Sequence, residues 1–247
     1  MSVTRAVILA AGVGSRLRPL TDGRPKCLLE VAGRTLIDHQ LAALGRFGIA
    51  DVTVVVGYCG DRVRQQVGDR VRYLENPRYE QTNSLYSLWL ARAELGPGSL
   101  ILNSDVLALP ALFDRLLQSP AANAILVERG DRFEAEDMKV MLNGPHVVDF
   151  GKNLPSDRAH AHNVGVAKFS GEGGPRLIEC LERLVATGHE NEWAPVAFLE
   201  FARHWPLTAV ATDGLPWIEI DYAEDLTRAR LEIEPAILSM DDAVPAP

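Results

Sequence analysis

The sequence is poor in cysteine, in lysine and in aromatic side chains. Three of its 247 residues are cysteines, 6% are aromatic, and only four of its 25 basic residues are lysines. The cysteines lie far apart without a CxxC pair, which argues against a disulfide framework and a cysteine zinc site. No apolar run approaches the roughly 18 residues that a membrane span requires. We therefore expect a cytoplasmic protein without a membrane partner.

Acidic residues outnumber basic ones, and the formal net charge is −8 at pH 7. A nucleic-acid binder needs a broad basic surface, so this balance argues against nucleic acid as a partner. A small anionic ligand in one local basic pocket remains compatible with it.

The first half of the chain alternates between apolar strand patterns and helical patterns. We expect strands at 5–11, 52–57, 71–74 and 99–102, and helices at 34–48, 60–67, 83–95 and 110–118. Asn83 is a candidate cap for the third helix. This alternation is typical of an α/β fold with a mostly parallel sheet.

Shorter strand patterns follow from about residue 123. We expect strands at 123–129, 138–142, 146–151 and 164–170, helices at 175–187 and 192–203, strands at 207–212 and 217–221, and a closing helix at 223–232. The composition after residue 236 predicts a flexible tail over 236–247.

The stretch ILAAGVGSRLRPLTDGRPK, from Ile8 to Lys26, follows the first predicted strand. Two glycines, Gly12 and Gly14, are followed by four cations: Arg16, Arg18, Arg24 and Lys26. Glycines let a backbone approach phosphates closely, and cations neutralise them, so the stretch predicts a phosphate site. Leu17 stands where a dinucleotide-binding fingerprint has its third glycine, and no Walker loop is present. The alternative is a solvated basic loop.

This stretch resembles the signature GxGxRxxPxTxxxPK of nucleotidyltransferases that join an NTP to a phosphorylated metabolite and release pyrophosphate. The matching residues are Gly12, Gly14, Arg16, Pro19, Thr21, Pro25 and Lys26. The resemblance implies that the backbone of Leu9, Ala10, Ala11 and Gly12 lies under the nucleobase. It also places Gly14 and Ser15 in the nucleotide site. Arg16 would hold the triphosphate and Lys26 would neutralise charge at the α-phosphate, which makes both residues catalytic candidates.

A triphosphate calls for Mg²⁺, which prefers one or two carboxylates together with water and phosphate oxygens. Asp105 and Asp221 each follow a predicted strand and resemble the family's metal ligands. Asp105 is also expected beside the nucleotide. Either aspartate could instead cap a helix or turn. Glu219 shares strand parity with Asp221 and could be a third ligand or contact the acceptor.

Two further stretches indicate a branch of this superfamily. ENPRYEQTNSLYSLWLA at 75–91 and WIEIDYAEDLTRA at 217–229 resemble the phosphocholine and phosphonate cytidylyltransferases. The resemblance implies CTP as the favoured NTP and places Asn83 and Ser84 near the base and ribose. Capping of the helix is the alternative for Asn83.

The acceptor site is expected in the second half of the chain. By resemblance, Lys139 and Lys152 reach the acceptor phosphate, and Asn163 stands where sugar-phosphate members carry a glutamate. A quaternary ammonium would favour aromatic faces. The aromatic candidates are Tyr79, Tyr86, Trp89, Trp193 and Trp217, of which Trp193 is the chosen acceptor residue.

Together these observations predict a three-layer α/β/α, Rossmann-like nucleotidyltransferase fold with a mostly parallel sheet and a small acceptor-binding insertion. We expect one domain over 1–235, with a nucleotide part at about 1–122, an acceptor part at about 123–212 and a metal-binding return strand at 217–221. The predicted reaction joins CTP to a small phosphorylated or phosphonate alcohol or amine. Alternatives are a sugar-1-phosphate nucleotidylyltransferase using UTP, GTP or dTTP, and a non-catalytic nucleotide sensor. The sequence leaves open whether the protein forms a homo-oligomer.

Overall fold

A nine-stranded sheet forms the centre of the protein, in a computed structural model that describes residues 3–96 and 98–242. Its strands, in spatial order, are β5 (Arg72–Glu75), β4 (Asp51–Val56), β1 (Arg5–Ala10), β6 (Gly98–Asn103), β11 (Ala161–Ser170), β8 (Asn123–Arg129), β12 (Thr208–Ala211), β10 (His146–Gly151) and β9 (Lys139–Asn143). Strands β10 and β11 run against the others. The α/β class is confirmed, with a mixed sheet.

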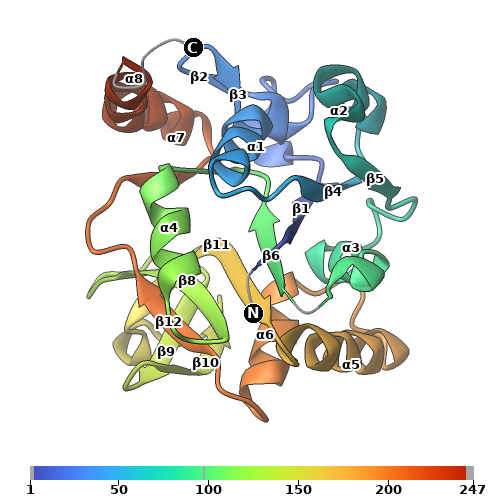
Figure 1. The fold of residues 1–247 in the computed structure, drawn as a ribbon, viewed down its shortest axis with the longest axis vertical. Helices are drawn as coiled ribbons and strands as arrows, with labels where there is room; N and C mark the ends of the chain where they lie inside the picture. The colour runs from blue at the N-terminus through green and yellow to red at the C-terminus, as the bar shows by residue number, and fades with distance from the viewer. Residues whose placement is uncertain (1–2, 97, 243–247) are drawn as a thin grey trace.

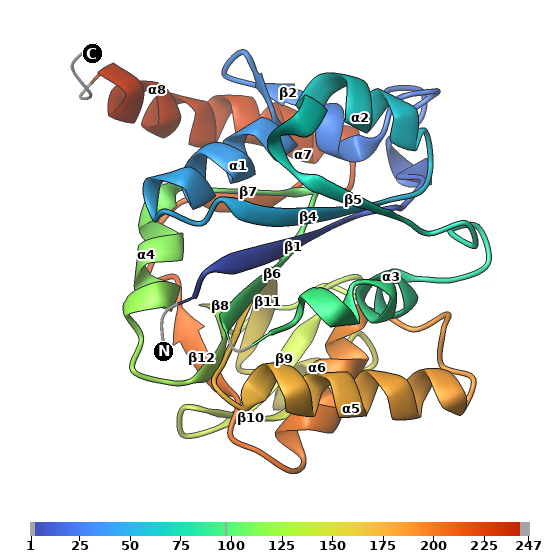
Figure 2. The ribbon, with the colours of Figure 1, turned by 45° about the vertical axis from the view of Figure 1, so that its right-hand side comes forward.

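Helices cover both faces of the sheet (Figure 2). The first layer holds α1 (Leu36–Arg46), α2 (Gly60–Val67) and α4 (Pro110–Gln118), and the second holds α3 (Ser84–Leu90), α5 (Gly173–Ala186) and α6 (Ala194–Ala202). In β1, Ile8 packs toward the first layer and Val7 toward the second, and neither is exposed to solvent. The continuous apolar run of this strand thus reflects burial on both faces, as a central parallel strand requires.

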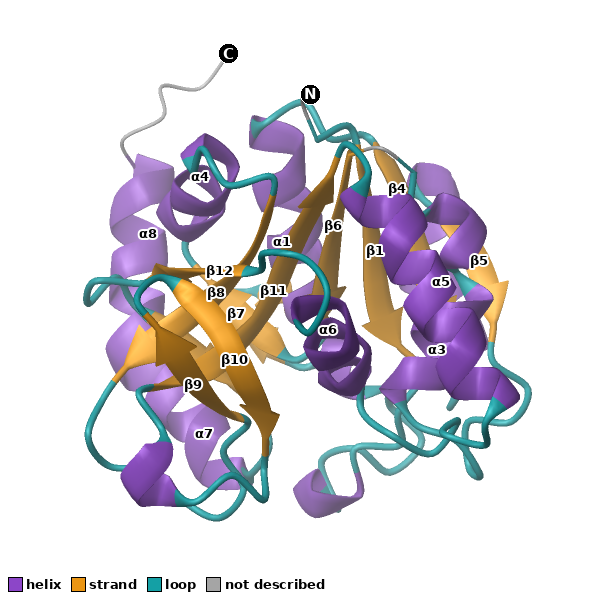
Figure 3. Cartoon of the chain, turned by 90° about the horizontal axis from the view of Figure 1, so that it is seen from below, coloured by secondary structure: helices purple, strands orange, loops and turns teal. Residues whose placement is uncertain are grey.

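The part of the sheet that follows β6 curls back on itself. Strand β11 pairs with both β6 and β8, and its first residues also pair with β9, so that Ala161 lies opposite Arg129 and Val140. Helix α6 packs on β10 and on the helices α3 and α5. Figure 3 shows α6 between the strands β9 and β10 and the strands β1, β4 and β5. This helix therefore joins the two halves of the chain.

The C-terminal segment is more ordered than the sequence predicts. Helix α7 (Ala223–Arg228), a π-helical turn (Ala229–Ile233) and α8 (Glu234–Asp242) run along one side of the molecule (Figure 1). The predicted tail from residue 236 is wrong up to residue 242, because Ile233 and Ile237 are buried in a third apolar cluster. The rest of that predicted tail, 243–247, lies outside the described residues.

Some element boundaries also differ from the prediction. Helix α3 ends at Leu90, and a 3-10 turn over Arg92–Glu94 replaces its expected last turn. That turn brings Leu95 into the cluster that α3 covers. Two short hairpin strands, β2 (Glu30–Val31) and β3 (Arg34–Thr35), precede α1. Across the described ranges, no helix has the length and apolar character needed to cross a bilayer.

Four neighbouring strands end at the same edge of the sheet. Ala10 of β1 lies beside Val56 of β4, which in turn lies beside Glu75 of β5, and Asn103 of β6 lies beside Leu9. In open α/β sheets, ligands bind in the crevice outside the carboxyl ends of such strands. A functional site is therefore expected among the loops that leave this edge.

Candidate active site

A cleft of about 350 Å³ opens at this edge of the sheet. It is lined from the loop after β1, the start of α3, the end of β6, and the segments around β9, β10, β11 and the short strand β13 (Trp217–Glu219). The predicted site residues that line it are Leu9, Ala10, Ala11, Gly12, Gly14, Ser15, Arg16, Lys26, Asn83, Ser84, Asp105, Lys152, Asn163, Trp193, Glu219 and Asp221. Predicted site residues as far apart in the sequence as Leu9 and Asp221 thus face one cavity.

Lys139 is the exception among the predicted site residues. Its side chain is buried, its Nζ donates to the backbone oxygen of Glu134 at 3.1 Å, and it does not line the cleft. Lys139 begins β9, beside the first residues of β11, so the strand pairing directs it into the protein. The expectation that it reaches an acceptor phosphate does not fit this position.

The loop after β1 is held in shape by its own residues. Gly14 has a φ of +64°, a left-handed conformation that favours glycine. The Thr21 hydroxyl donates to the Gly14 oxygen at 2.9 Å, and the Tyr58 hydroxyl accepts from the Gly23 N–H at 2.9 Å. A side chain on Gly57 would clash with the Ala11 oxygen, so the loop passes close to the end of β4. The glycines and Thr21 of the motif therefore shape the cleft wall.

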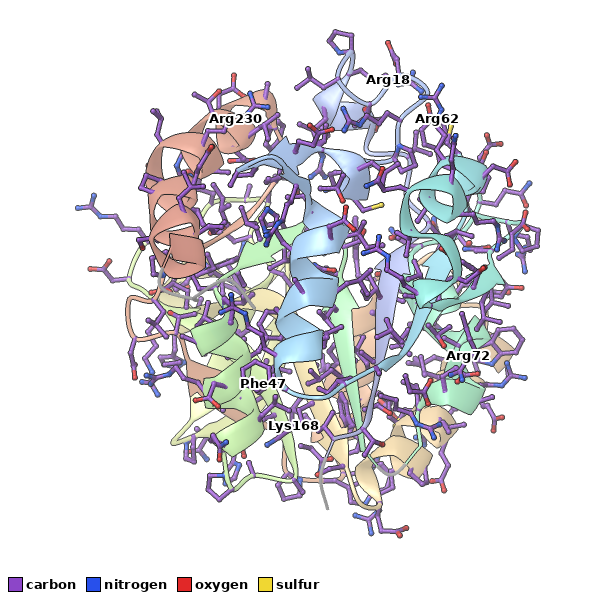
Figure 4. All side chains as sticks on the ribbon, turned by 45° about the horizontal axis from the view of Figure 1, so that its top comes forward. Arg18, Phe47, Arg62, Arg72, Lys168 and Arg230 are labelled. Atoms are coloured by element: carbon purple, nitrogen blue, oxygen red, sulfur yellow. The ribbon has the colours of Figure 1, made fainter. Side chains whose placement is uncertain are left out.

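The four cations of this loop divide into two pairs. Arg16 and Lys26 line the cleft. Arg18 pairs with Asp22 on the surface, at the outer rim of the molecule seen in Figure 4, and Arg24 binds the Glu30 carboxylate at 2.7 Å. Half of the positive charge in the motif thus stabilises the loop and its surroundings, and half faces the cavity.

Lys26 lies between two carboxylates. Its Nζ is 2.6 Å from Asp105 Oδ2 and 2.5 Å from Asp221 Oδ1. Burial alone would lower the pKa of Lys26, but the two negative charges raise it above its ordinary value, so the ammonium stays charged. The pKa of Asp221 is lowered, because Lys26 and Arg16 outweigh the opposing effect of its burial.

A short strand pair brings the two aspartates together. Strand β7 (Val106–Ala108), which the sequence analysis missed, pairs antiparallel with β13 (Trp217–Glu219), and Val106 lies opposite Glu219. The Ile220 N–H then donates to the backbone oxygen of Asp105 at 3.0 Å. The Asp225 carboxylate accepts from the Asp221 and Tyr222 N–H groups, which leaves the Asp221 side chain directed at Lys26 and Arg16. The N-cap of the closing helix is therefore Tyr222, with Asp225 at the third helical position completing a capping box, and Asp221 does not cap the helix.

Three carboxylates meet beside Lys26. Asp105, Glu219 and Asp221 each offer an oxygen atom, and these atoms lie within 4.8 Å of one another. Asp105 Oδ1 is buried and has no hydrogen-bond partner. Burial, together with the charges of Asp105 and Asp221, raises the pKa of Glu219 to about 8. A cluster that holds one carboxyl partly protonated and leaves one oxygen unpaired is suited to a divalent cation.

Glu136 is a cleft residue that the sequence analysis missed. Its Oε2 accepts from Arg16 at 2.8 Å and from Lys152 at 3.0 Å. Lys152 Nζ also lies 4.8 Å from the centre of the Trp193 ring, which is 40% exposed. Glu136 stands in an acidic stretch, EAED, without a periodic pattern, so only the fold reveals that it faces two predicted phosphate-binding cations.

The other aromatic candidates divide between the cleft and the surface. Tyr79 lines the cleft together with Trp193. Tyr86 and Trp89 stack on each other, with ring centres 5.3 Å apart, and do not line the cleft. Trp217 packs against His162 and donates from Nε1 to Glu128, also away from the cavity. The described cleft residues thus form no cage of aromatic faces around one point.

The start of α3 connects two walls of the cleft. Asn83 caps the helix by accepting from the Ser84 N–H at 2.8 Å, and it also lines the cleft. The Ser84 hydroxyl accepts from the Ala194 N–H at 2.8 Å, which fixes Trp193 beside it. Asn76, another missed residue, is buried and donates to Ser87 and Thr82, which orders the wall of the cavity.

A glycine loop with two cations faces three carboxylates, of which Asp105 follows the parallel strand β6. Such a loop at the carboxyl ends of parallel strands is typical of α/β proteins that bind phosphorylated nucleotides. Residues 6–212 match the MobA-like NTP transferase domain, and the chain belongs to this family. It is a nucleotidyltransferase related to the phosphocholine and phosphonate cytidylyltransferases, so the sensor alternative is set aside.

Two relatives illustrate the similarity in sequence. The chain is 30% identical over 248 residues to the CTP:phosphoglutamine cytidylyltransferase of Campylobacter jejuni, covering 90% of this chain and 97% of that protein. It is 40% identical over 130 residues to the CMP-5'-(3-aminopropyl)phosphonate synthase of Streptomyces rubellomurinus. That match covers 51% of this chain but 21% of the synthase.

Solved structures show the same fold. The CTP:phosphocholine cytidylyltransferase LicC of Streptococcus pneumoniae aligns with a TM-score of 0.77 at 23% identity, covering 94% of this chain and 100% of that one. The inositol-1-phosphate CTP transferase of T. maritima aligns with a TM-score of 0.80 at 22% identity, covering 96% and 97%.

Proposed function

We propose that this enzyme transfers the cytidylyl group of CTP to a small phosphorylated or phosphonate amine or alcohol and releases pyrophosphate. The observation that carries the proposal is the position of Lys26 between Asp105 and Asp221, with Arg16 bound to Asp221 at 3.0 Å. This arrangement concentrates positive charge and carboxylates at one end of the cleft. The cytidylyltransferases among the relatives support CTP as the nucleotide.

In the proposed reaction an oxygen of the acceptor's phosphate or phosphonate attacks the α-phosphorus of CTP. The bond from the α-phosphorus to the oxygen bridging the α- and β-phosphates breaks, and pyrophosphate leaves with that electron pair. The acceptor oxygen is already ionised, so the protein has no proton to remove. Lys26 and Arg16 stabilise the charge that spreads over the phosphates and hold them in line.

The three-carboxylate cluster fits Mg²⁺. Asp105 and Asp221 would hold the ion, with Glu219 as a third ligand or as a partner of bound water. The unpaired Asp105 Oδ1 is an oxygen of the kind this ion prefers. When bound, the ion would neutralise charge on the transferring phosphates. Lys26 would then move from the carboxylates toward the α-phosphate.

The acceptor is expected against Lys152, Asn163 and Trp193, in the part of the chain from about residue 123 to 212. Lys152 supplies a cation for the acceptor phosphate, and Trp193 supplies one exposed aromatic face. A single face suits a primary amine or an alcohol better than a quaternary ammonium, which favours several faces. Asn163 offers an amide in place of the carboxylate expected for a sugar phosphate.

The test is pyrophosphate release with Mg²⁺, crossing four NTPs against a panel of acceptors. The panel holds phosphoglutamine, aminoethylphosphonate, phosphocholine, glycerol phosphate and several sugar 1-phosphates. We expect release with CTP and one amine- or alcohol-bearing acceptor. Release only with a sugar 1-phosphate and UTP, GTP or dTTP would contradict the proposal and support the sugar-nucleotide alternative.

A further inference from the structure

A single carboxylate oxygen joins the two halves of the cleft. Glu136 Oε2 accepts hydrogen bonds from Arg16 Nη2 at 2.8 Å and from Lys152 Nζ at 3.0 Å. Arg16 belongs to the loop after β1, Lys152 follows β10, and Glu136 lies in the loop 130–138 between β8 and β9. The two cations that face phosphate groups in the proposed reaction are therefore both paired with one anion of the protein.

Backbone hydrogen bonds hold both ends of the loop that carries Glu136, whereas the Glu136 side chain is exposed to solvent. The Gly130 N–H donates to the His160 oxygen, and the Asn163 N–H donates to the Met138 oxygen at 2.9 Å. The Glu136 side chain itself is 51% exposed. Its carboxylate can therefore leave the two cations by side-chain rotation, without unfolding of the loop.

The Glu136 carboxylate occupies the positions beside Arg16 and Lys152 at which the phosphates of the substrates are expected. Its hydrogen bond from Lys152, and the charges of Lys152 and Arg16, lower its pKa, so it is ionised at neutral pH. A phosphate that approaches Arg16 or Lys152 competes with this carboxylate for the cation, because two anions beside one cation repel each other. Arg16 has a second contact, to Asp221 at 3.0 Å.

We propose that Glu136 is a positioning residue that acts as an internal counter-ion, displaced from Arg16 by the nucleotide's phosphates and from Lys152 by the acceptor's phosphate. The inference rests on the proposed function for the identity of these phosphates. Once either substrate has broken one contact, the carboxylate is held by a single cation, and the second substrate displaces it more easily. Glu136 thus couples nucleotide binding to acceptor binding, and the coupling is reciprocal.

The test compares Glu136→Gln with Glu134→Gln. Glu134 is an exposed carboxylate in the same loop that does not line the cleft, so its variant makes the same charge change away from the cations. Binding of inorganic tripolyphosphate is measured by calorimetry, with and without Mg²⁺. We expect E136Q to bind about two- to tenfold more tightly, the size expected for one or two exposed ion pairs. E134Q should match the wild type.

Steady-state kinetics give a second readout that a merely structural role would not move. In E136Q the KM for CTP and the inhibition constant of pyrophosphate should both fall by about two- to tenfold, without a rise in kcat. Unchanged tripolyphosphate affinity in E136Q, or equal tightening in E134Q, would overturn the inference. Weaker acceptor binding at unchanged tripolyphosphate affinity would also overturn it, by making Glu136 a direct acceptor contact. Tripolyphosphate binding needs no turnover. The binding result therefore tests the role of Glu136 even if the proposed cytidylyl transfer is not observed.

Discussion

Lys26 and Asp221 lie 195 positions apart in the sequence, yet the Nζ of one is 2.5 Å from the Oδ1 of the other. The contact joins the loop after the first strand to the last strand before the C-terminal helices. Both residues were identified separately by their local motifs. Their contact helps to raise the pKa of Lys26 and to lower the pKa of Asp221, so both side chains stay charged.

Replacing Lys26 with alanine should reduce kcat by about a hundred- to a thousandfold while changing CTP affinity far less. The reason is that Lys26 would act on charge that develops at the α-phosphate during the reaction. Pyrophosphate release and calorimetric CTP binding check this. Arg18→Ala is the control, because Arg18 belongs to the same loop but pairs with Asp22 at the rim. Equal losses of binding and turnover in K26A would refute this role.

Asp105→Asn should abolish binding of Mn²⁺, used as a spectroscopic substitute for Mg²⁺, and lower turnover by about a hundredfold or more. The substitution replaces an oxygen of the three-carboxylate cluster with an amide. Titration followed by electron paramagnetic resonance measures the bound metal. Asp114→Asn, an exposed aspartate of α4, should bind Mn²⁺ like the wild type. Full metal affinity in D105N would show that Asp105 is not a ligand of the ion.

Glu219 should make the metal-free protein less stable as the pH rises. Its pKa is about 8 in the folded chain against an ordinary value of 4.5, raised by burial and by Asp105 and Asp221. Between these values the folded chain holds a proton that the unfolded chain has lost. Its free energy of unfolding therefore falls with pH, by at most about 1.4 kcal/mol per unit from this group.

Glu219→Gln removes this titration, so its stability relative to the wild type should increase between roughly pH 5 and pH 8. Denaturant unfolding in EDTA measures the difference at both ends of the window. Glu224→Gln, at an exposed position of α7, is the matched control. A stability difference for E219Q that is constant across the window would show that Glu219 does not titrate there.

Asn83 combines a structural and a functional position, and two variants separate them. Asn83→Ala should lower the free energy of unfolding by about 1 kcal/mol, since the N-cap of α3 is lost, whereas Asn83→Ser keeps a capping oxygen. If the amide also contacts the nucleotide, both variants should raise the KM for CTP. Chemical denaturation and steady-state kinetics give the two readouts. An unchanged KM in both variants would restrict Asn83 to capping.

Trp193→Ala should raise the acceptor KM by about two- to fivefold and leave the KM for CTP unchanged. The substitution removes the ring face that Lys152 approaches at 4.8 Å, and such contacts are worth about 0.5–1 kcal/mol at exposed sites. Trp193→Phe keeps a ring, so its acceptor KM should lie between those of the wild type and Trp193→Ala. An increase in the KM for CTP of the same size would place Trp193 on the nucleotide side.

Local patterns were enough to predict the α/β class, the central strands and the phosphate-binding loop. A buried parallel strand such as β1 needs a continuous apolar run, and a loop that approaches phosphates needs glycines and cations, so both leave a signal within a few residues. The same holds for Asp105 and Asp221, because each lies two residues beyond the end of a strand.

Only the tertiary structure decided which of these residues meet and which point away. Strand pairing turns Lys139 inward, the pairing of β7 with β13 sets Glu219 beside Asp105, and burial of Ile237 extends the C-terminal helix. Glu136 contacts Arg16, which lies 120 positions away in the sequence, and no local pattern predicts this contact. The separation of two side chains depends on the whole path of the chain between them, and a local motif does not encode that path.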